Sequence, residues 1–337
     1  MAELGAASQR STLLVSRSQV DSCISMADVI DVVEKVFRAH GEGQAEMPAK
    51  ITLDLGRFGI DAWTNAMPAY LHPMGAAGIK WAGGYVHNPA SAGLPYVMAT
   101  IIVQDPTTGY PVAVMEGGQI TNLRTGAVVA VCVKYYAGPG THVMAVVGAG
   151  VQGRFALAAT AQITDLAEVR VTDVRPGAAE VFAREMKQSV DAPVIACDSV
   201  ERAVRDADVV VTVTPADAPL VADEWLTPGV TAISMGSFQE FADEAVLKSD
   251  KIVVDSWEQC AHRGELKRLV DGKRLSREGI FAEIGETVAG LRPGREADGE
   301  RIMAVPIGLG SHDIAVARLV YDRVKERSDG IRFDFLG

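Results

Sequence analysis

The sequence has few cysteines, few aromatic residues and no long apolar run. Its four cysteines, Cys23, Cys132, Cys197 and Cys260, lie far apart and form no CxxC pair, so we interpret them as structural thiols of a reducing compartment. No apolar run approaches the ~18 residues that span a bilayer, and the N-terminus lacks the basic start and apolar core of a secretory signal. These absences predict a cytoplasmic protein.

Positive charge is also scarce, since 32 lysines and arginines stand against 43 aspartates and glutamates and give a net charge of −11. This balance disfavours a nucleic acid or an anionic membrane as partner, because both bind basic surfaces. A small anionic substrate is still compatible with it where a few cations converge. The six histidines show no HxxxH or HxH spacing, so no metal site is indicated.

The length of the chain, 337 residues, exceeds the roughly 100–200 of one domain, so two domains are expected. In the front half, apolar residues at helical spacing predict an amphipathic helix over 26–40. Strand-like runs follow at 50–55, 78–83 and 96–105, and the turn at 105–111 predicts a hairpin with 112–115. We therefore expect a mixed front region with a largely antiparallel sheet.

From residue 143 onward the pattern alternates regularly. Strand-like runs stand at 143–148, 168–173, 193–197, 208–214, 230–236 and 251–256, and helix-like segments follow the first three. This alternation predicts right-handed βαβ units, and therefore an α/β fold with a Rossmann-type doubly wound parallel sheet. A last amphipathic helix is predicted at 311–327, after a Gly/Pro-rich crossing between domains at 305–310.

The stretch "MAVVGAGVQGRF" contains a complete GxGxxG at Gly148, Gly150 and Gly153, between a strand and a helix. In such a motif the first glycine permits a tight turn, the second lets a pyrophosphate approach the backbone, and the third lets helix and strand pack closely. Asp173 ends the next strand, where a carboxylate can accept both ribose hydroxyls. We therefore predict bound NAD, with NADP as the alternative because Arg175 could meet a 2′-phosphate.

The candidate cofactor-binding residues include the glycine turn, the end of the following strand and the carboxyl ends of two later strands, where open parallel sheets bind ligands. They are Gly148, Ala149, Gly150, Val151, Gln152, Gly153, Asp173, Val174, Arg175, Thr212, Thr214, Met235 and Gly236. The alternative is a structural αβ turn that binds no ligand.

Three cations of the front half are candidates for binding the substrate. Lys80 lies on an apolar strand, although a solvated tip is an equally ordinary role for a strand lysine. Arg124 is expected in the first turn of a long helix, where a cation opposes the helix dipole and where an arginine fork suits a carboxylate ligand. Lys50 is the weakest of the three on the evidence of the sequence alone.

Several motifs together resemble the ornithine cyclodeaminase and μ-crystallin family: "MPAYL", "GIKWAGG", "DPTTGYPVAVMEG", "ITNLRTGA", "VVGAGVQG" and "GLGSHDIAVA". The resemblance runs in order from about Met47 to Ala317. It implies an NAD(P)-dependent enzyme of amino and imino acids, usually a homodimer. It also implies a substrate-binding and dimerisation domain of mixed α+β structure over 1–123 with 314–337, and an NAD(P)-binding Rossmann domain over 124–313.

The same resemblance carries over residue roles. Lys80 and Arg124 match the family's substrate-binding lysine and arginine, whereas Lys50 stands where many members have an arginine fork. We therefore predict Lys80 and Arg124 as catalytic and substrate-binding residues, with Lys50 and Tyr96 as further substrate contacts; plain packing is the alternative for Tyr96. Asp313 also matches a family position, and capping of the last helix is its ordinary alternative role.

Cyclodeaminase members use an aspartate shortly after a strand-ending glycine. Here Ser237 and then Phe238 follow Gly236, and an aromatic ring cannot accept a proton. Glu240 or Asp243 could substitute, although both are expected to face solvent. This departure favours hydride transfer, as in alanine dehydrogenase-like enzymes or imino acid and ketimine reductases, with Lys80 also donating or relaying a proton. The alternatives are an ornithine cyclodeaminase-type ammonia lyase with bound NAD, and a non-catalytic NAD(P)H-binding crystallin-like protein.

Overall fold

The computed structural model describes residues 11–216, 218–327 and 330–336, and contacts divide the chain into two compact units. The first unit comprises the described residues of Met1–Ser25, Ala45–Thr121 and Gly310–Gly337, and the second comprises those of Met26–Gln44 and Asn122–Leu309. The sequence-based boundaries kept 26–44 in the first domain. The structure groups this segment with the second unit because helix α2 (Met26–Gly41) packs closely on helix α11 (Ile284–Val288).

The first unit is built on one sheet with the strand order β16-β1-β7-β6-β5-β4-β2, and β3 pairs with β4. All neighbouring pairs are antiparallel except β1 and β7. The strands are β1 Thr12–Val15, β2 Ala45–Glu46, β3 Ile51–Asp54, β4 Ala62–Leu71, β5 Ala76–Tyr85, β6 Val97–Gln104, β7 Pro111–Glu116 and β16 Ile331–Phe333. Its short helices are α1 Arg17–Cys23, η1 Gly56–Phe58, η2 His72–Met74 and α3 Asn88–Ser91.

The hairpin of β6 and β7 confirms the sequence-based prediction, whereas strand β4 was not predicted. β4 pairs with β5 over its whole length, from Ala62↔Tyr85 to Leu71↔Ala76. Its sequence, AWTNAMPAYL, contains an asparagine and a proline and no run of β-branched residues, so it carries little strand signal. Tertiary pairing defines this strand.

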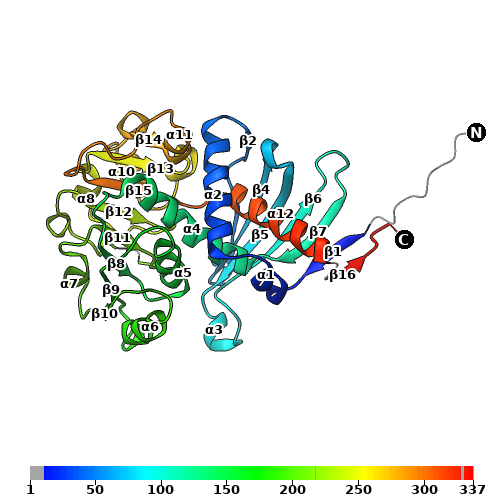
Figure 1. Cartoon of the computed structure of the whole chain (residues 1–337), viewed down its shortest axis with the longest axis horizontal. Helices are drawn as coiled ribbons and strands as arrows, with labels where there is room; N and C mark the ends of the chain where they lie inside the picture. The colour runs from blue at the N-terminus through cyan, green and yellow to red at the C-terminus, as the bar shows by residue number, and fades with distance from the viewer. Residues whose placement is uncertain (1–10, 217, 328–329, 337) are drawn as a thin grey trace, which may run out of the picture. The chain divides into compact units, whose positions relative to one another are not determined.

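Helix α12 (Gly310–Arg327) confirms the predicted last helix and packs on β4, β5 and β6 of the same unit (Figure 1). Its start approaches the sheet closely, because a Cβ on Gly310 would lie only 3.0 Å from the Cβ of Met67. The sheet face opposite α12 leaves apolar side chains exposed. We call it the outer face, and its exposed apolar residues are Ile51, Leu53, Trp81, Met98 and Ile102.

The second unit contains a wholly parallel sheet with the order β10-β9-β8-β11-β12-β15-β13-β14. Its strands are β8 Val143–Val147, β9 Glu168–Thr172, β10 Val194–Ala196, β11 Val209–Thr212, β12 Thr231–Ser234, β13 Lys251–Val254, β14 Ala282–Glu283 and β15 Ile302–Val305. Its further helices are α5 Val151–Thr160, α6 Ala178–Met186, α7 Val200–Val204, η3 Asp223–Trp225, α8 Asp243–Leu247, α9 Trp257–Cys260, α10 Lys267–Asp271 and η4 Arg277–Gly279. Helix α4 (Gly118–Tyr136) begins in the first unit and continues in the second.

This sheet confirms the predicted α/β doubly wound fold. The strand order reverses between β8 and β11, and ligands of such folds bind outside the carboxyl ends of the strands at this switch point. Strands β14 and β15 were not predicted, and β15 inserts between β12 and β13. Strands β11, β12, β13 and β15 have four residues each, and every one of these residues is buried. Strands that are buried on both faces are rich in apolar residues, as these are.

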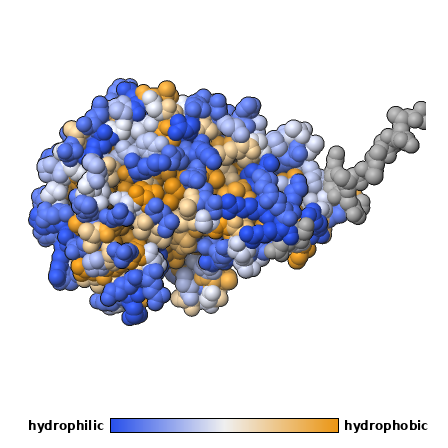
Figure 2. Space-filling view, in the orientation of Figure 1, coloured by the Kyte–Doolittle hydropathy of each residue, from blue (hydrophilic) through white to orange (hydrophobic). Residues whose placement is uncertain are grey.

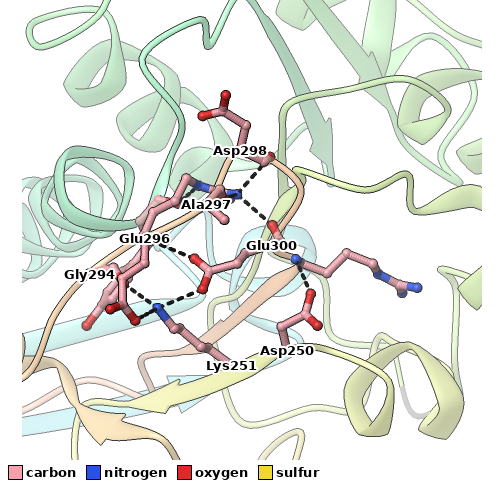
Figure 3. Close-up of polar contacts among 10 residues, drawn as sticks. Asp250, Lys251, Gly294, Glu296, Ala297, Asp298 and Glu300 are labelled. Atoms are coloured by element: carbon pink, nitrogen blue, oxygen red, sulfur yellow. Dashed lines mark hydrogen bonds and ion pairs between the residues drawn. The ribbon is translucent and has the colours of Figure 1, made fainter.

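An ionic cluster fastens the amino end of β13 to the segment that leads into β15 (Figure 3). The buried ammonium of Lys251 donates to Gly294 O at 2.7 Å and to Glu296 Oε2 at 2.8 Å, and it lies 2.9 Å from Glu300 Oε1. Two carboxylates and a carbonyl therefore compensate the burial of this lysine. The cluster lies at the amino edge of the sheet, opposite to the edge where a ligand is expected.

Hydrophilic residues predominate on the face shown in Figure 2, with apolar residues exposed between them. Within the described ranges, no helix is both long and apolar enough to cross a membrane. All four cysteines are described and buried, and no disulfide joins them.

Candidate active site

The turn between β8 and α5 requires two of its three glycines for steric reasons and leaves space at the third. Gly148 has a φ of 112°, and a Cβ on it would lie 2.9 Å from Val213 O. A Cβ on Gly153 would lie 2.4 Å from Gly148 O, so only glycine lets α5 pack against this turn. A Cβ on Gly150 would meet no atom within 4 Å. Its missing side chain leaves a cradle beside the backbone.

This cradle fits the pyrophosphate of a dinucleotide. Gly150 is the N-cap of α5 and supplies no side chain to the first N–H groups of that ten-residue helix. Unpaired N–H groups and the positive end of the helix dipole favour an anion at this position. Val151 is exposed, and Gln152 donates through Nε2 to Asn122 Oδ1 at 3.0 Å.

Asp173 follows β9 and forms the expected carboxylate at the end of that strand. Its Oδ2 accepts the N–H of Ala149 at 2.8 Å, so it is fixed against the glycine turn. Arg175 donates to both carboxylate oxygens, from Nε and Nη2, each at 2.9 Å. Burial raises the pKa of Asp173, but the hydrogen bonds from Arg175 and Ala149 outweigh burial and leave the pKa below its ordinary value. Val174, between them, is 98% exposed, and its contact with a cofactor stays a prediction.

The candidate residues after β11 are joined to a glutamate. Thr212 Oγ1 donates to Glu240 Oε2 at 2.8 Å, and Thr214 donates to Glu240 Oε1 from its Oγ1 at 2.8 Å and from its N at 2.7 Å. Thr212 is fully buried, and its contact with a cofactor stays a prediction. Thr214 is half-buried, as are Met235 and Gly236 after β12.

The two carboxylates considered as substitutes for the missing aspartate lie in different surroundings. Glu240 is fully buried, and the expectation that it faces solvent was wrong. Asp243 is partly exposed and forms ion pairs with Arg268 and Arg274. Phe238 is half-buried in the loop between β12 and α8.

Lys80 lies on β5 and points into the first unit rather than toward solvent, with 2% of its surface exposed. Its Nζ donates to Asp313 Oδ2 at 2.7 Å and to Thr121 Oγ1 at 3.4 Å. Asp313, on α12, is fully buried and also accepts from Thr121 Oγ1 at 3.3 Å. Strand β5 and helices α4 and α12 thus bring together an ammonium, a hydroxyl and a carboxylate.

Arg124 is buried in the second unit, but not in the first turn of its helix as expected. Helix α4 begins at Gly118, so Arg124 stands in the second turn and the argument from the helix dipole does not apply. Its guanidinium lies against Gly308, where a Cβ would be 2.9 Å from Nη1. The N–H of Gly308 in turn donates to the buried Asp255 Oδ2 at 2.6 Å.

Lys50 and Tyr96 occupy strand beginnings of the first unit. Lys50 is half-buried immediately before β3, and Tyr96 is half-buried immediately before β6. The hydroxyl of Tyr96 accepts from Trp63 Nε1 at 3.3 Å. Their contact with a substrate stays a prediction.

Sequence reasoning missed two carboxylates of these groups. Asp313 matched a family position, with helix capping as its alternative role, but it was not among the predicted site residues; it pairs with Lys80, 233 positions away in the sequence. Glu265 accepts Ser234 Oγ at 2.9 Å and the N–H of Glu240 at 2.8 Å. A glutamate in an otherwise ordinary segment, "RGELKRL", gives no local signal for this role. Asp313 could have been found from its apolar surroundings in "SHDIAVA".

Known proteins resemble this chain over nearly its full length. The model of the Ornithine cyclodeaminase/mu-crystallin family matches residues 10–328. Alanine dehydrogenase from Archaeoglobus fulgidus is 38% identical over 328 residues, which cover 96% of this chain and 98% of that protein.

Solved structures share the fold. An archaeal alanine dehydrogenase dimer with bound NAD has 38% identity and a TM-score of 0.89, over 96% of this chain and 99% of that one. Thermococcus litoralis Δ1-pyrroline-2-carboxylate reductase, in complex with NADH and L-proline, has 33% identity and a TM-score of 0.91, over 95% and 99%. The family match over almost the whole chain confirms the resemblance seen in the motifs. This chain belongs to the ornithine cyclodeaminase/mu-crystallin family.

Proposed function

We propose that this protein is an NAD(H)-dependent oxidoreductase that acts on the CH–NH2 or C=N group of a small amino or imino acid. The relatives described above support this reading, since one is an alanine dehydrogenase with bound NAD and another a reductase in complex with NADH and L-proline. The glycine cradle and Asp173 of this chain supply the corresponding dinucleotide-binding features.

The observation that carries the proposal is the buried Lys80–Asp313 pair. Burial of two charges is costly, and buried ion pairs of this kind are often no more stabilising than apolar residues of the same size. Lys80 and Asp313 are 2% and 0% exposed, and they meet at 2.7 Å. A contribution to the stability of the fold is therefore a poor explanation for the buried Lys80–Asp313 pair. A role in proton transfer explains the pair better.

The cofactor would be held by Gly150 and the start of α5 at its pyrophosphate and by Asp173 at its ribose. When bound, NAD(H) supplies the hydride acceptor or donor. Asp173 accepts from Nε and Nη2 along one edge of the Arg175 guanidinium, so this edge is committed to the carboxylate and is less able to bind a 2′-phosphate. We therefore assign NAD as the cofactor in preference to NADP.

In the proposed reaction, Lys80 and Arg124 bind the substrate carboxylate, with Lys50 and Tyr96 as further contacts. The cations orient the reacting carbon and stabilise charge as hydride moves. Lys80 also donates or relays the proton of the amino or imino nitrogen, and Asp313 positions its ammonium. Phe238 disfavours the cyclodeaminase reaction, because the side chain at that position cannot accept a proton.

A spectroscopic screen tests the proposal. Purified protein is mixed with NAD and single amino acids, and with NADH and 2-oxo acids plus ammonia or methylamine, while nicotinamide absorbance is followed. A substrate-dependent change supports the oxidoreductase. Proline formed from ornithine without net NADH change would establish the lyase instead, and tight NADH binding without any turnover would establish a crystallin-like binding protein.

We further propose a cytoplasmic homodimer formed through the outer face of the first unit. This face exposes Trp81 and Met98, which line a hollow together with Thr64 and Thr100. Exposed apolar patches of this kind mark interaction sites. Trp81→Glu is expected to yield monomers in analytical ultracentrifugation, whereas the control Leu291→Glu, at an exposed apolar position of the second unit, keeps the dimer. A dimeric Trp81→Glu variant would rule this interface out.

A further inference from the structure

Two buried glutamates join the carboxyl ends of neighbouring strands in the second unit. Glu240 and Glu265 are 0% and 3% exposed. Glu240 accepts from Thr212, at the end of β11, and Glu265 accepts from Ser234, at the end of β12. Thr212 and Ser234 are paired across the two strands. Because Glu265 Oε2 also accepts the backbone N–H of Glu240 at 2.8 Å, the two residues belong to one hydrogen-bonded group.

No lysine or arginine of the described chain forms an ion pair with either carboxylate. Glu240 accepts two hydroxyl groups and one N–H, and Glu265 accepts one hydroxyl group and two N–H groups. Their neighbours Phe241 and Leu266 belong to the apolar core of this unit. Two carboxylates in such surroundings are costly to ionise together, so their presence calls for a compensating role.

Both carboxylates hold loops that carry candidate cofactor contacts. Glu240 binds the N–H and the hydroxyl of Thr214, and this hydroxyl accepts the N–H of Ala216 at 3.2 Å. On the other side, Gly264, with a φ of 73°, packs so closely on the loop after β12 that its Cβ would lie 2.8 Å from Gly236 O. Glu240 thus contacts Thr214 directly, and Glu265 directly follows the glycine that packs on Gly236.

We infer that Glu240 and Glu265 are positioning residues for the dinucleotide, and that they hold Thr214 and Gly236 in the binding arrangement as long as the two carboxylates are not both ionised. The inference rests on the proposed function, because it assumes that NAD(H) binds at this edge. A second ionisation places two negative charges in an apolar surrounding. Their repulsion loosens the loops and weakens cofactor binding.

The titration of the pair falls in the range where this matters. Burial raises the pKa of each carboxyl group to about 7. For Glu240, hydrogen bonds from Thr214 and Thr212 act against burial and the charge of Glu265 acts with it. For Glu265, its hydrogen bonds and the charge of Arg268 on α10 act against burial. Arg268 itself is paired with Asp243.

Cofactor binding is then coupled to the uptake of a proton. Below the raised pKa the pair already carries its proton, and above it NADH binding must restore that proton. We expect the Kd of NADH to rise about fivefold between pH 6 and pH 8, which corresponds to a shift of one pKa unit on binding. Calorimetric titrations at pH 8 in buffers of different ionisation enthalpy should show net proton uptake.

Two variants test the role of Glu240. Glu240→Gln fixes this side chain in a neutral form of the same size, so its NADH Kd should vary less than threefold between pH 6 and pH 8 and its proton uptake should vanish. Glu240→Ala leaves the donors of Thr212 and Thr214 without their acceptor, so its NADH Kd should rise at least tenfold at every pH.

Lys251→Met is the matched control, because it breaks a buried ionic cluster at the opposite edge of the same sheet. It should lower the melting temperature while the Kd of NADH and its pH profile stay as in the wild type. Wild-type affinity and an unchanged pH profile in Glu240→Gln would overturn the inference and leave the proposed function intact. A wild-type protein that does not bind NADH would overturn the proposed function itself.

Discussion

At the scale of single residues, Lys80 and Asp313 have the environment of reactive groups. Each is buried, and each compensates the charge of the other across 2.7 Å. Removal of one partner from a buried pair commonly costs about 3–5 kcal/mol, because the other charge stays buried. A test of Lys80 must therefore separate loss of chemistry from loss of stability.

Lys80→Met is expected to reduce turnover by about 10²–10⁴-fold, since a positioned acid or base contributes that factor, while the Kd of NADH stays within twofold. Steady-state rates and NADH fluorescence titrations measure the two effects. The double variant Lys80→Met with Asp313→Asn removes the uncompensated carboxylate, so it should regain melting temperature but not turnover. Turnover retained in Lys80→Met would exclude the catalytic role.

Asp173 and Arg175 decide the nucleotide preference at the same scale. Asp173→Ser removes the carboxylate that holds the Arg175 fork, so the fork becomes available to a 2′-phosphate. The Kd of NADPH should fall about tenfold and that of NADH should rise about tenfold, because a charged hydrogen bond contributes about 1.5–3 kcal/mol. Fluorescence titrations with both nucleotides measure this. In the double variant with Arg175→Ala the gain for NADPH should disappear; a gain that persists would assign it to another residue.

At the scale of elements, the glycines of the turn from β8 into α5 serve two purposes. One is required by the packing of the turn, and another leaves space for a ligand. Gly153 is required by packing, since its Cβ would lie 2.4 Å from Gly148 O, whereas Gly150 has open space. The φ of Gly150 is −84°, which an alanine adopts without strain. The two glycines therefore predict different consequences for the same substitution.

Gly150→Ala should leave the melting temperature nearly unchanged and raise the Kd of NADH at least tenfold, because its methyl group fills the cradle. Gly153→Ala should destabilise the protein by about 1–3 kcal/mol, the usual range for overpacking. Thermal unfolding and NADH titration on both variants provide the comparison. Equal NADH affinity in Gly150→Ala and the wild type would show that the pyrophosphate does not lie in the cradle.

At the scale of the whole molecule, the glutamate pair makes stability depend on pH. The pKa of Glu265 is raised to about 7 in the folded chain from an ordinary value of 4.5. A raised pKa gives a stabilisation that is complete below the unfolded pKa and is lost as the pH rises through the folded pKa. The window of loss for this group is therefore roughly pH 4.5 to 7.

Glu265→Gln does not titrate, so the wild type should lose stability relative to this variant across that window. The change in the difference should be on the order of 3 kcal/mol, from the rise of the pKa from 4.5 to about 7. Urea unfolding at several pH values and one protein concentration measures it. Parallel pH profiles for the two proteins would contradict the assignment of the titration to Glu265.

Local patterns in the sequence were sufficient for much of the fold. The alternation after residue 143 predicted six parallel strands and three helices, and all of them are present. The strands could be recognised because a buried parallel strand is rich in apolar residues. The turn between β8 and α5 could also be predicted from the spacing of its glycines, because Gly148 and Gly153 are required there for steric reasons. Strands β4 and β15 were not predicted from the sequence, because their formation depends on pairing with other strands of the sheet.

The sequence by itself determined the fold class, the cofactor turn and the candidate cations, because each follows from spacing between near neighbours or from motifs. Only the tertiary structure decided what these side chains contact. It paired Lys80 with Asp313, placed Arg124 against Gly308, and buried Glu240 beside Glu265. Such contacts join segments far apart in the chain, and burial, which sets their charge and reactivity, is a property of the folded whole.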